Sequence, residues 1–256
     1  MGKENVWNIM RLRQGNTPRD AAGFLGPEHA GEEYQVTFWC FAVWNDTHKI
    51  MVDTGISLAD EHPWYTDIPI IFTPEERLER QLADNLGWTF DDIDTVIHTH
   101  LHYDHTGHNR EMRNAVFYVQ KEEYEWALTC PATGFGFAYN KSNYDKTSVP
   151  YYNWRFVEGE QLIYPGIMVF PTPGHGHMHQ SVLVNTKDGA ACITGDAANT
   201  LVSLEKELAV GPLQDAYAQM KSYKKIKQVS ELIITAHDIN SDTCYDHQTD
   251  GWPRIN

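Results

Sequence analysis

Histidines are concentrated in two short segments of this sequence. The chain has 13 histidines in 256 residues, so a window of eleven residues should hold 11 × 13/256, or about half of one. Residues 175–179 hold three, and residues 98–108 hold five, namely His98, His100, His102, His105 and His108. Because imidazole is the commonest metal ligand in proteins, this clustering indicates a metal site.

The spacing within residues 98–108 is suited to two metal ions. The segment follows an apolar run, Thr95–Ile97, and a loop that follows a strand holds its side chains on a rigid support. His100 and His102 are two residues apart, whereas Asp104 and His105 are adjacent and point in different directions. One loop can therefore serve two ions. Carboxylate oxygens and imidazole nitrogens together suit zinc, manganese, iron or cobalt.

The surrounding sequence predicts a mixed α/β domain. Short runs rich in Val, Ile and Thr predict strands at residues 37–44, 49–52, 95–98, 116–119, 167–170, 181–184, 191–194 and 232–235. Helices are expected at 73–87, which opens with a capping-box pattern, and at 121–128 and 212–229. Strands that alternate with helices, with the strands more numerous, favour two sheets packed together with helices outside.

Composition excludes several classes of protein. Lysine and arginine number 20 against 35 acidic residues, and the net charge of −15 argues against a nucleic-acid partner. The longest apolar run, Phe38–Trp44, is too short to cross a bilayer, and residues 1–13 lack the apolar core of a signal peptide. The four cysteines form no C-x-x-C pair, which favours free thiols in a reducing compartment. We therefore expect a cytoplasmic protein.

The segment from His100 to His105 resembles the H-x-H-x-D-H signature of the metallo-β-lactamase superfamily. Four further landmarks of that superfamily follow the same order along the chain: a V-D-T-G turn at 52–55, T-P-G-H at 172–175, G-D at 195–196 and A-H-D at 236–238. The resemblance implies an α/β fold, the αβ/βα four-layer sandwich in which helices flank two mixed β-sheets. It also implies a single hydrolase domain over residues 1–256.

Within the superfamily the chain is most similar to the N-acyl homoserine lactonases, the enzymes of quorum quenching. Their H-L-H-F-D-H-A-G is similar to H-L-H-Y-D-H-T-G at 100–107, and their G-H-Q-S is similar to residues 179–181. The resemblance implies two divalent metal ions, zinc first, with manganese, iron and cobalt left open. Its implied ligands are His100, His102 and His175 for one ion, Asp104, His105 and His237 for the other, and Asp196 as the bridge.

This resemblance also implies a mechanism and a substrate. A hydroxide that bridges the metals would attack the lactone carbonyl, and Asp104 would carry the proton to the leaving oxygen. The lactonases have a tyrosine three residues after the bridging aspartate, where this chain has Asn199. An amide can also donate a hydrogen bond to a substrate carbonyl, but it is shorter than tyrosine and not acidic.

Several alternatives stay open at this point. Asn199 favours a related metallo-hydrolase that acts on another lactone, a thioester or a phosphoester. An aromatic-rich loop at 131–154 would line a substrate pocket, form a lid or contact a second chain, so a homodimer is left open. Di-iron redox chemistry is disfavoured because this length leaves no room for a flavin domain. His98, His179 and Asp53 are expected to support the ligands rather than to bind metal.

Overall fold

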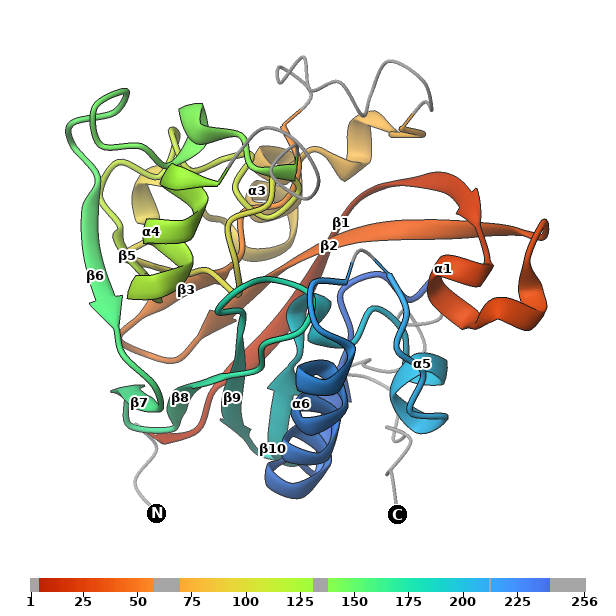
Figure 1. Cartoon of the computed structure of the whole chain (residues 1–256). Helices are drawn as coiled ribbons and strands as arrows, with labels where there is room; N and C mark the ends of the chain where they lie inside the picture. Colours follow the sequence, from red (N-terminus) through yellow and green to blue (C-terminus); the bar gives the residue numbers. More distant parts are fainter. Residues whose placement is uncertain (1–4, 58–69, 131–137, 212, 240–256) are drawn as a thin grey trace. The chain divides into compact units, whose positions relative to one another are not determined.

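The computed structural model describes residues 5–57, 70–130, 138–211 and 213–239 (Figure 1). The chain divides into two compact units. The first unit comprises residues 8–17 and 38–158, and the second comprises residues 1–7, 18–37 and 159–256. The H-x-H-x-D-H segment belongs to the first unit, whereas the T-P-G-H, G-D and A-H-D segments belong to the second.

A six-stranded mixed sheet forms the framework of the first unit. Its order is β1 (Asn8–Asp20), β2 (Glu33–Trp44), β3 (Lys49–Val52), β4 (Thr95–Ile97), β5 (Val116–Gln120) and β6 (Asn153–Val157). Strands β2 and β3 pair antiparallel, and β3 to β6 are parallel. Every residue of β4 is buried, as expected for a central parallel strand written as a continuous apolar run.

Among its described residues the first unit has two α-helices, and the predicted helix at 73–87 is divided into a 3₁₀ turn and an α-helix because Arg77 between them is extended. Thr73 and Glu76 form a capping box around a short 3₁₀ turn, and α3 (Leu78–Leu86) follows it. Gly87 ends α3 with a φ of 67°, the left-handed conformation that glycine adopts without strain. Helix α4 (Lys121–Thr129) begins directly after β5. The apolar side chains of both helices join one core cluster with strands β4 and β5, which includes Leu78, Leu82, Val96, Phe117 and Ala127.

A five-stranded mixed sheet forms the framework of the second unit. Its order is β11 (Leu232–Ile234), β10 (Gly189–Ile193), β9 (Gln180–Thr186), β8 (Ile167–Pro171) and β7 (Gln161–Tyr164). Only the β10–β11 pair is parallel among the pairs described for this sheet. Two loops of this sheet carry predicted motifs. Residues 172–179, between β8 and β9, contain T-P-G-H, and residues 194–200, after β10, contain G-D.

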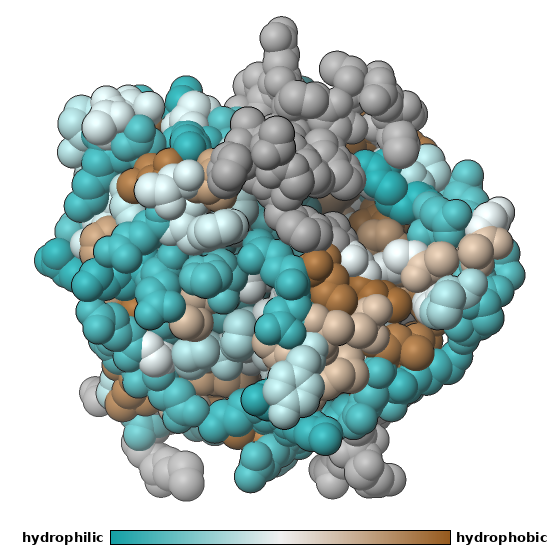
Figure 2. Space-filling model, in the orientation of Figure 1, coloured by the Kyte–Doolittle hydropathy of each residue, from teal (hydrophilic) through white to brown (hydrophobic). Residues whose placement is uncertain are grey.

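Helix α6 (Ala216–Val229) covers part of the second unit's sheet, and α1 (Ala22–Leu25) and α5 (Leu201–Glu205) are short. Asp215 caps α6 by accepting a hydrogen bond from the Ala218 amide. Tyr223 and Ile226 of α6 pack with Phe170 and Ile233 in the core of this unit. The outer surface of α6 is largely hydrophilic on the face shown in Figure 2, and its sequence contains four lysines.

The structure agrees with most of the predicted elements. All eight predicted strands are present, and their limits differ from the predicted ones by at most four residues. Helix α6 begins at Ala216, four residues later than predicted, because Asp215 provides its N-cap. Strands β1, β6 and β7 were not predicted. No helix in the described part of the chain is both long and apolar enough to cross a membrane.

Candidate metal centre

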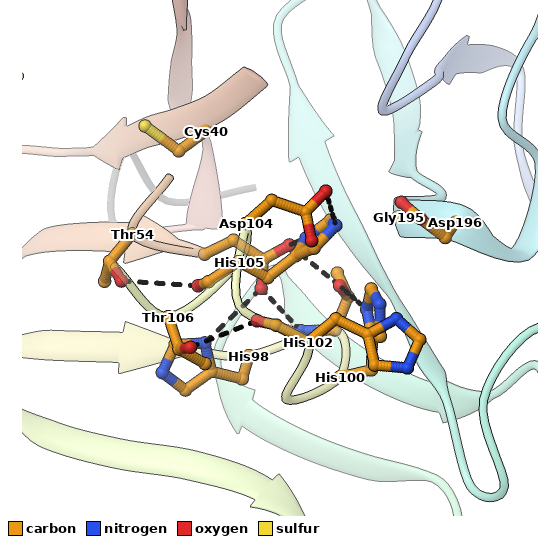
Figure 3. Close-up of polar contacts among 12 residues, drawn as sticks. Cys40, Thr54, His98, His100, His102, Asp104, His105, Thr106, Gly195 and Asp196 are labelled. Atoms are coloured by element: carbon orange, nitrogen blue, oxygen red, sulfur yellow. Dashed lines mark hydrogen bonds and ion pairs between the residues drawn. The ribbon is translucent and has the colours of Figure 1, made fainter. Parts of the chain in front are cut away.

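The loop after β4 brings together four of the predicted ligands. His100, His102, Asp104 and His105 are all buried, and Figure 3 shows their side chains gathered around this loop. The ring centroid of His100 lies 4.4 Å from that of His102 and 4.1 Å from that of His105. The Nε2 atom of His105 lies 3.8 Å from a carboxylate oxygen of Asp104. One short loop thus carries four of the seven predicted ligands.

Asp53 orients this loop from the V-D-T-G turn. Its carboxylate accepts hydrogen bonds from the Thr99 amide at 2.8 Å and the Thr99 hydroxyl at 2.7 Å, and it lies 2.8 Å from His105 Nδ1. Burial raises the pKa of Asp53, but His105 and His98 lower it more, so the net pKa lies below its usual range. Because Nδ1 of His105 is engaged by Asp53, the opposite nitrogen, Nε2, is the one presented as a metal ligand.

Gly107 allows the two turns to pack closely. A Cβ atom at this position would lie 2.2 Å from the Ser57 amide nitrogen, a distance no side chain tolerates. The Gly107 amide donates to the carbonyl of Gly55 at 2.8 Å, and the Thr54 amide donates to the carbonyl of His105 at 2.9 Å. The glycine that follows H-x-H-x-D-H-x in the sequence is therefore required by backbone contact with the V-D-T-G turn.

Glu123 and Tyr139 support the same loop, a role that the sequence did not indicate for either residue, since Tyr139 was expected only as part of the aromatic-rich loop at 131–154. The Glu123 carboxylate is fully buried and accepts hydrogen bonds from the Tyr139 hydroxyl at 2.9 Å and from the Leu101 amide at 3.3 Å. The Tyr139 ring contacts His102 edge-on, with ring centroids 4.6 Å apart. Burial, and next the Glu123 charge, raise the pKa of Tyr139 far above its usual value, so its hydroxyl remains a donor.

The second unit brings together the other three predicted ligands. One carboxylate oxygen of Asp196, Oδ2, lies 3.2 Å from His175 Nε2 and 3.1 Å from His237 Nε2. The other ring nitrogen of His237, Nδ1, contacts the Thr37 carbonyl at 2.9 Å. An oxygen placed between two imidazole nitrogens is the arrangement expected of a carboxylate that bridges two cations.

Helix α6 supports the loops that carry these ligands. The carbonyl of Gly174 accepts hydrogen bonds from the amides of Gln214 and Asp215, at 2.8 and 3.0 Å, just before α6 begins. Gly174 has a φ of +141°, and a Cβ atom there would lie 2.7 Å from the Gln219 amide nitrogen. The side chain of Gln219 donates to the Ala197 carbonyl, one residue after Asp196. The T-P-G-H turn and the G-D turn are thus both attached to one helix.

The remaining histidines and the aromatic loop agree with supporting roles. His98 is buried and stacks on Phe117, and its Nδ1 lies 3.4 Å from Asp53. His177 is exposed, whereas His179 is buried with Nδ1 3.0 Å from the Thr172 hydroxyl. In the loop predicted to line a pocket, most aromatic side chains are core residues: Tyr139, Tyr144, Tyr152 and Trp154. Its Phe135 and Phe137, and the isolated His62 and His247, lie outside the described residues.

Asn199 lies three residues after Asp196 and is buried, with 1% of its surface exposed. Its backbone carbonyl accepts a hydrogen bond from the His237 amide at 3.0 Å, which ties it to a predicted ligand. Asp238 connects the same two segments, because its carboxylate accepts the Leu201 amide at 3.0 Å. Asn199 is therefore held in the same loop cluster as Asp196 and His237.

The donor set is suited to divalent transition metals. The two units present buried imidazole nitrogens and carboxylate oxygens, without a described thiolate among them. Such nitrogen and oxygen donors bind zinc, manganese, iron and cobalt. The Asp53 carboxylate accepts a hydrogen bond from His105 Nδ1, and the Thr37 carbonyl accepts one from His237 Nδ1. Such bonds fix the orientation of an imidazole ring whose other nitrogen binds a metal.

Comparisons with known proteins agree with this chemistry. A family model described as the metallo-beta-lactamase superfamily matches residues 39–237. An N-acyl homoserine lactonase of Bacillus thuringiensis is 29% identical over 226 residues, covering 83% of this chain and 85% of that protein. The N-acyl homoserine lactonase AttM of Agrobacterium fabrum is also 29% identical, covering 81% and 84%.

The fold is confirmed by similarity to solved structures. One is an N-acyl homoserine lactone hydrolase solved with the product N-hexanoyl-L-homoserine at its catalytic metal centre. It superposes with a TM-score of 0.77 at 25% identity and covers 93% of this chain and 96% of that one. The expected α/β sandwich of two mixed sheets with helices is thus the fold of this chain.

Proposed function

Because the chain belongs to the metallo-β-lactamase superfamily, we propose that it is a metal-dependent hydrolase that opens the lactone ring of N-acyl homoserine lactones. The observation that carries this proposal is the placement of Asp196, one of whose oxygens lies within 3.2 Å of imidazole nitrogens from two different loops. The similarity to N-acyl homoserine lactonases over more than four-fifths of the chain supports the choice of substrate.

We assign the ligands as follows, with the two units acting together as one hydrolase domain. One ion would be held by His100, His102 and His175, and the other by Asp104, His105 and His237. Asp196 would serve as a ligand of both. Two divalent ions and two carboxylates give 4 − 2 = +2, a charge that attracts an ester carbonyl. We propose zinc as the metal, because the ligands are mainly imidazoles.

The bound ions would supply the Lewis acidity and the activated water that ester hydrolysis at neutral pH requires. The side chains perform the remaining tasks. We assign to Asp104, whose carboxylate lies 3.8 Å from His105 Nε2, the task of carrying the proton to the leaving alkoxide. Asn199 donates a hydrogen bond to the substrate carbonyl. Asp53 and Glu123 hold the loop rigid, so that the donors need not reorganise during the reaction.

We also propose a reducing, cytoplasmic location, which the free thiols support. Cys40, Cys130 and Cys192 are all free and buried, and Cys244 lies outside the described residues. Buried thiols of this kind persist where glutathione keeps cysteine reduced.

Ring opening releases one proton per turnover, so the test is proton release from an N-acyl homoserine lactone by the metal-loaded chain. We expect chelation and His102→Ala each to abolish the reaction, and elemental analysis to find two ions per wild-type chain. His29→Ala is the matched control, because His29 pairs with Glu32 on the surface at 3.1 Å. A metal-loaded chain that opens no N-acyl homoserine lactone of any chain length refutes the proposal.

A second candidate keeps the metal chemistry and changes the substrate to another lactone, a thioester or a phosphoester. Asn199 in place of the lactonase tyrosine is the observation that favours it. The two candidates are separated by kcat/KM values for a lactone, a thioester and a phosphoester under identical conditions. Preference for the thioester or phosphoester would replace the first assignment.

A further inference from the structure

The imidazole of His102 has two aromatic neighbours, the His100 ring on its own loop (Figure 3) and the Tyr139 ring from the aromatic-rich loop. The His102 ring centroid lies 4.4 Å from that of His100, with 75° between the ring planes. It lies 4.6 Å from that of Tyr139, with 76° between the planes. Aromatic rings favour this edge-to-face geometry, so both contacts favour one orientation of the His102 ring.

The Tyr139 side chain is itself fixed to a helix. Its hydroxyl donates to Glu123 Oε1 on α4 at 2.9 Å, and the residue is only 6% exposed. The same carboxylate oxygen accepts the amide of Leu101, the residue directly before His102, at 3.3 Å. One buried carboxylate thus holds both the ring that contacts His102 and the backbone that carries it.

The segment that follows residue 137 is attached to the ligand loop at further points. The Ala138 carbonyl accepts the amide of Tyr103, the residue directly after His102, at 2.8 Å. The Asn143 carbonyl accepts a hydrogen bond from Asn109 Nδ2 at 3.2 Å. The ring of residue 139 is therefore held against His102 by the backbone of its own segment as well as by its hydroxyl.

Other ligands of the loop are supported by Asp53. Its carboxylate lies 2.8 Å from His105 Nδ1. It also accepts the Thr99 hydroxyl at 2.7 Å, and the oxygen of that hydroxyl lies 3.1 Å from His100 Nδ1. In the proposed assignment His100 and His105 serve different ions, so Asp53 acts on both ions. The tyrosine contact is made to His102, which is assigned to one ion.

We infer that Tyr139 is a positioning residue that orients His102 before metal binding and thereby sets the affinity of one of the two proposed ions. The inference rests on the proposed function, which assigns His102 to that ion. A side chain that is already held in its bound orientation loses less conformational freedom when a ligand binds. Loss of a group that orients a metal ligand lowers metal affinity by about 10- to 100-fold. The ion assigned to Asp104, His105 and His237 should keep its affinity.

Titration of the metal-free full chain with zinc tests this inference without substrate. We expect two ions to bind per wild-type chain. In Tyr139→Leu, which removes the flat ring, one ion should bind about 10- to 100-fold more weakly and the other within about threefold of its wild-type affinity. Tyr139→Phe keeps the ring contact, and both ions should stay within about threefold of the wild type. Should the leucine variant not fold, Tyr139→Met fills the space with a flexible side chain and is expected to give the same result.

Tyr144→Leu is the matched control, because it makes the same substitution at a buried tyrosine of the same loop. Tyr144 is fully buried, and its hydroxyl donates to the Ala127 carbonyl of α4 at 3.1 Å. We expect this variant to have a lower melting temperature but unchanged affinity for both ions. It therefore separates general destabilisation from loss of the ring contact with His102.

Recovery of activity by zinc gives a second measurement. Because Tyr139 acts through His102, Tyr139→Leu should regain the wild-type kcat for an N-acyl homoserine lactone at saturating zinc. Unchanged zinc affinity, equal weakening of both ions, or a loss of kcat that zinc does not restore overturns the inference and leaves the lactonase function standing. A wild-type chain that binds two ions but opens no lactone overturns the function alone. A wild-type chain that binds fewer than two ions overturns both.

Discussion

The hydrogen bond from Tyr139 to Glu123 should stabilise the H-x-H-x-D-H loop measurably. Tyr139→Phe removes only the hydroxyl, so the edge-on ring contact with His102 is retained. The fully buried Glu123 carboxylate then keeps the Leu101 amide as a partner at 3.3 Å and loses its shorter bond of 2.9 Å. A hydrogen bond to a charged group contributes about 1.5–3 kcal/mol, and we expect Tyr139→Phe to lower the free energy of unfolding by that amount.

A double-mutant cycle shows whether the charge of Glu123 is the cause. In Glu123→Gln the amide oxygen still accepts from Tyr139, but a neutral hydrogen bond contributes only about 0.5–1.5 kcal/mol. The decrease in the free energy of unfolding caused by Tyr139→Phe should therefore be about 1 kcal/mol smaller in the Glu123→Gln background than in the wild type.

Urea denaturation of the metal-free chain measures these differences. Tyr217→Phe is the matched control, because Tyr217 is 71% exposed on α6 and its loss should change the free energy of unfolding by less than about 0.5 kcal/mol. Two results would refute this explanation. One is that Tyr139→Phe lowers the free energy of unfolding no more than the control does, and the other is that it lowers it equally in the wild type and in the Glu123→Gln background.

Three further predictions follow from the structure. Gly174→Ala places a Cβ atom against the backbone of Gln219 and disturbs the two hydrogen bonds to the Gly174 carbonyl. We expect urea denaturation to show a free energy of unfolding lower by about 2–4 kcal/mol, together with a lower metal content. An unchanged free energy of unfolding and metal content would contradict this prediction. Hydrogen bonds from the Thr89 amide and hydroxyl, and next from Lys49, lower the pKa of Asp92 from 3.8 to about 2. The ionised Asp92 therefore stabilises the fold above pH 3.8, and this stabilisation is lost as the pH falls toward 2. Asp92→Asn should therefore unfold with a shallower pH dependence between these values, and an unaltered acid limb would rule this out. Chelation should lower the melting temperature, and added zinc should restore it in a concentration-dependent way, because the metal binds the folded chain and not the unfolded one. A melting temperature that does not depend on zinc would count against the metal site.

The predicted elements were accurate where a local pattern is strong. The β4 run Thr95–Ile97 and the Thr73 capping box were identified because apolar runs and caps are defined by neighbouring residues. Strand β1 was missed because its sequence is polar and contains both a glycine and a proline. Strand β6 was missed because Trp154 lies in an aromatic-rich segment that also suits a loop, and only its pairing with Phe117 in β5 makes it a strand.

The candidate ligands were all accessible to sequence reasoning, whereas the residues that support them were not. His100 to His105 are close in sequence, and the T-P-G-H, G-D and A-H-D turns each have a recognisable local pattern. Glu123 could have been suspected from its position in the helix after β5, but its contact with Leu101 spans 22 residues. Gln219 has no local signal, because its partners lie on loops that meet α6 only after folding.

The order of the motifs in the sequence was enough to determine the superfamily and the class of chemistry and to predict the metal-binding side chains, because each motif is local and the donor atoms of each residue type are known. The tertiary structure decided what could not be local. Asp53 and Thr37 fix the two imidazole rings, and the described part of the aromatic-rich loop contributes four side chains to the core. Burial and hydrogen bonding between distant segments depend on how the chain packs, and that packing is a property of the whole fold.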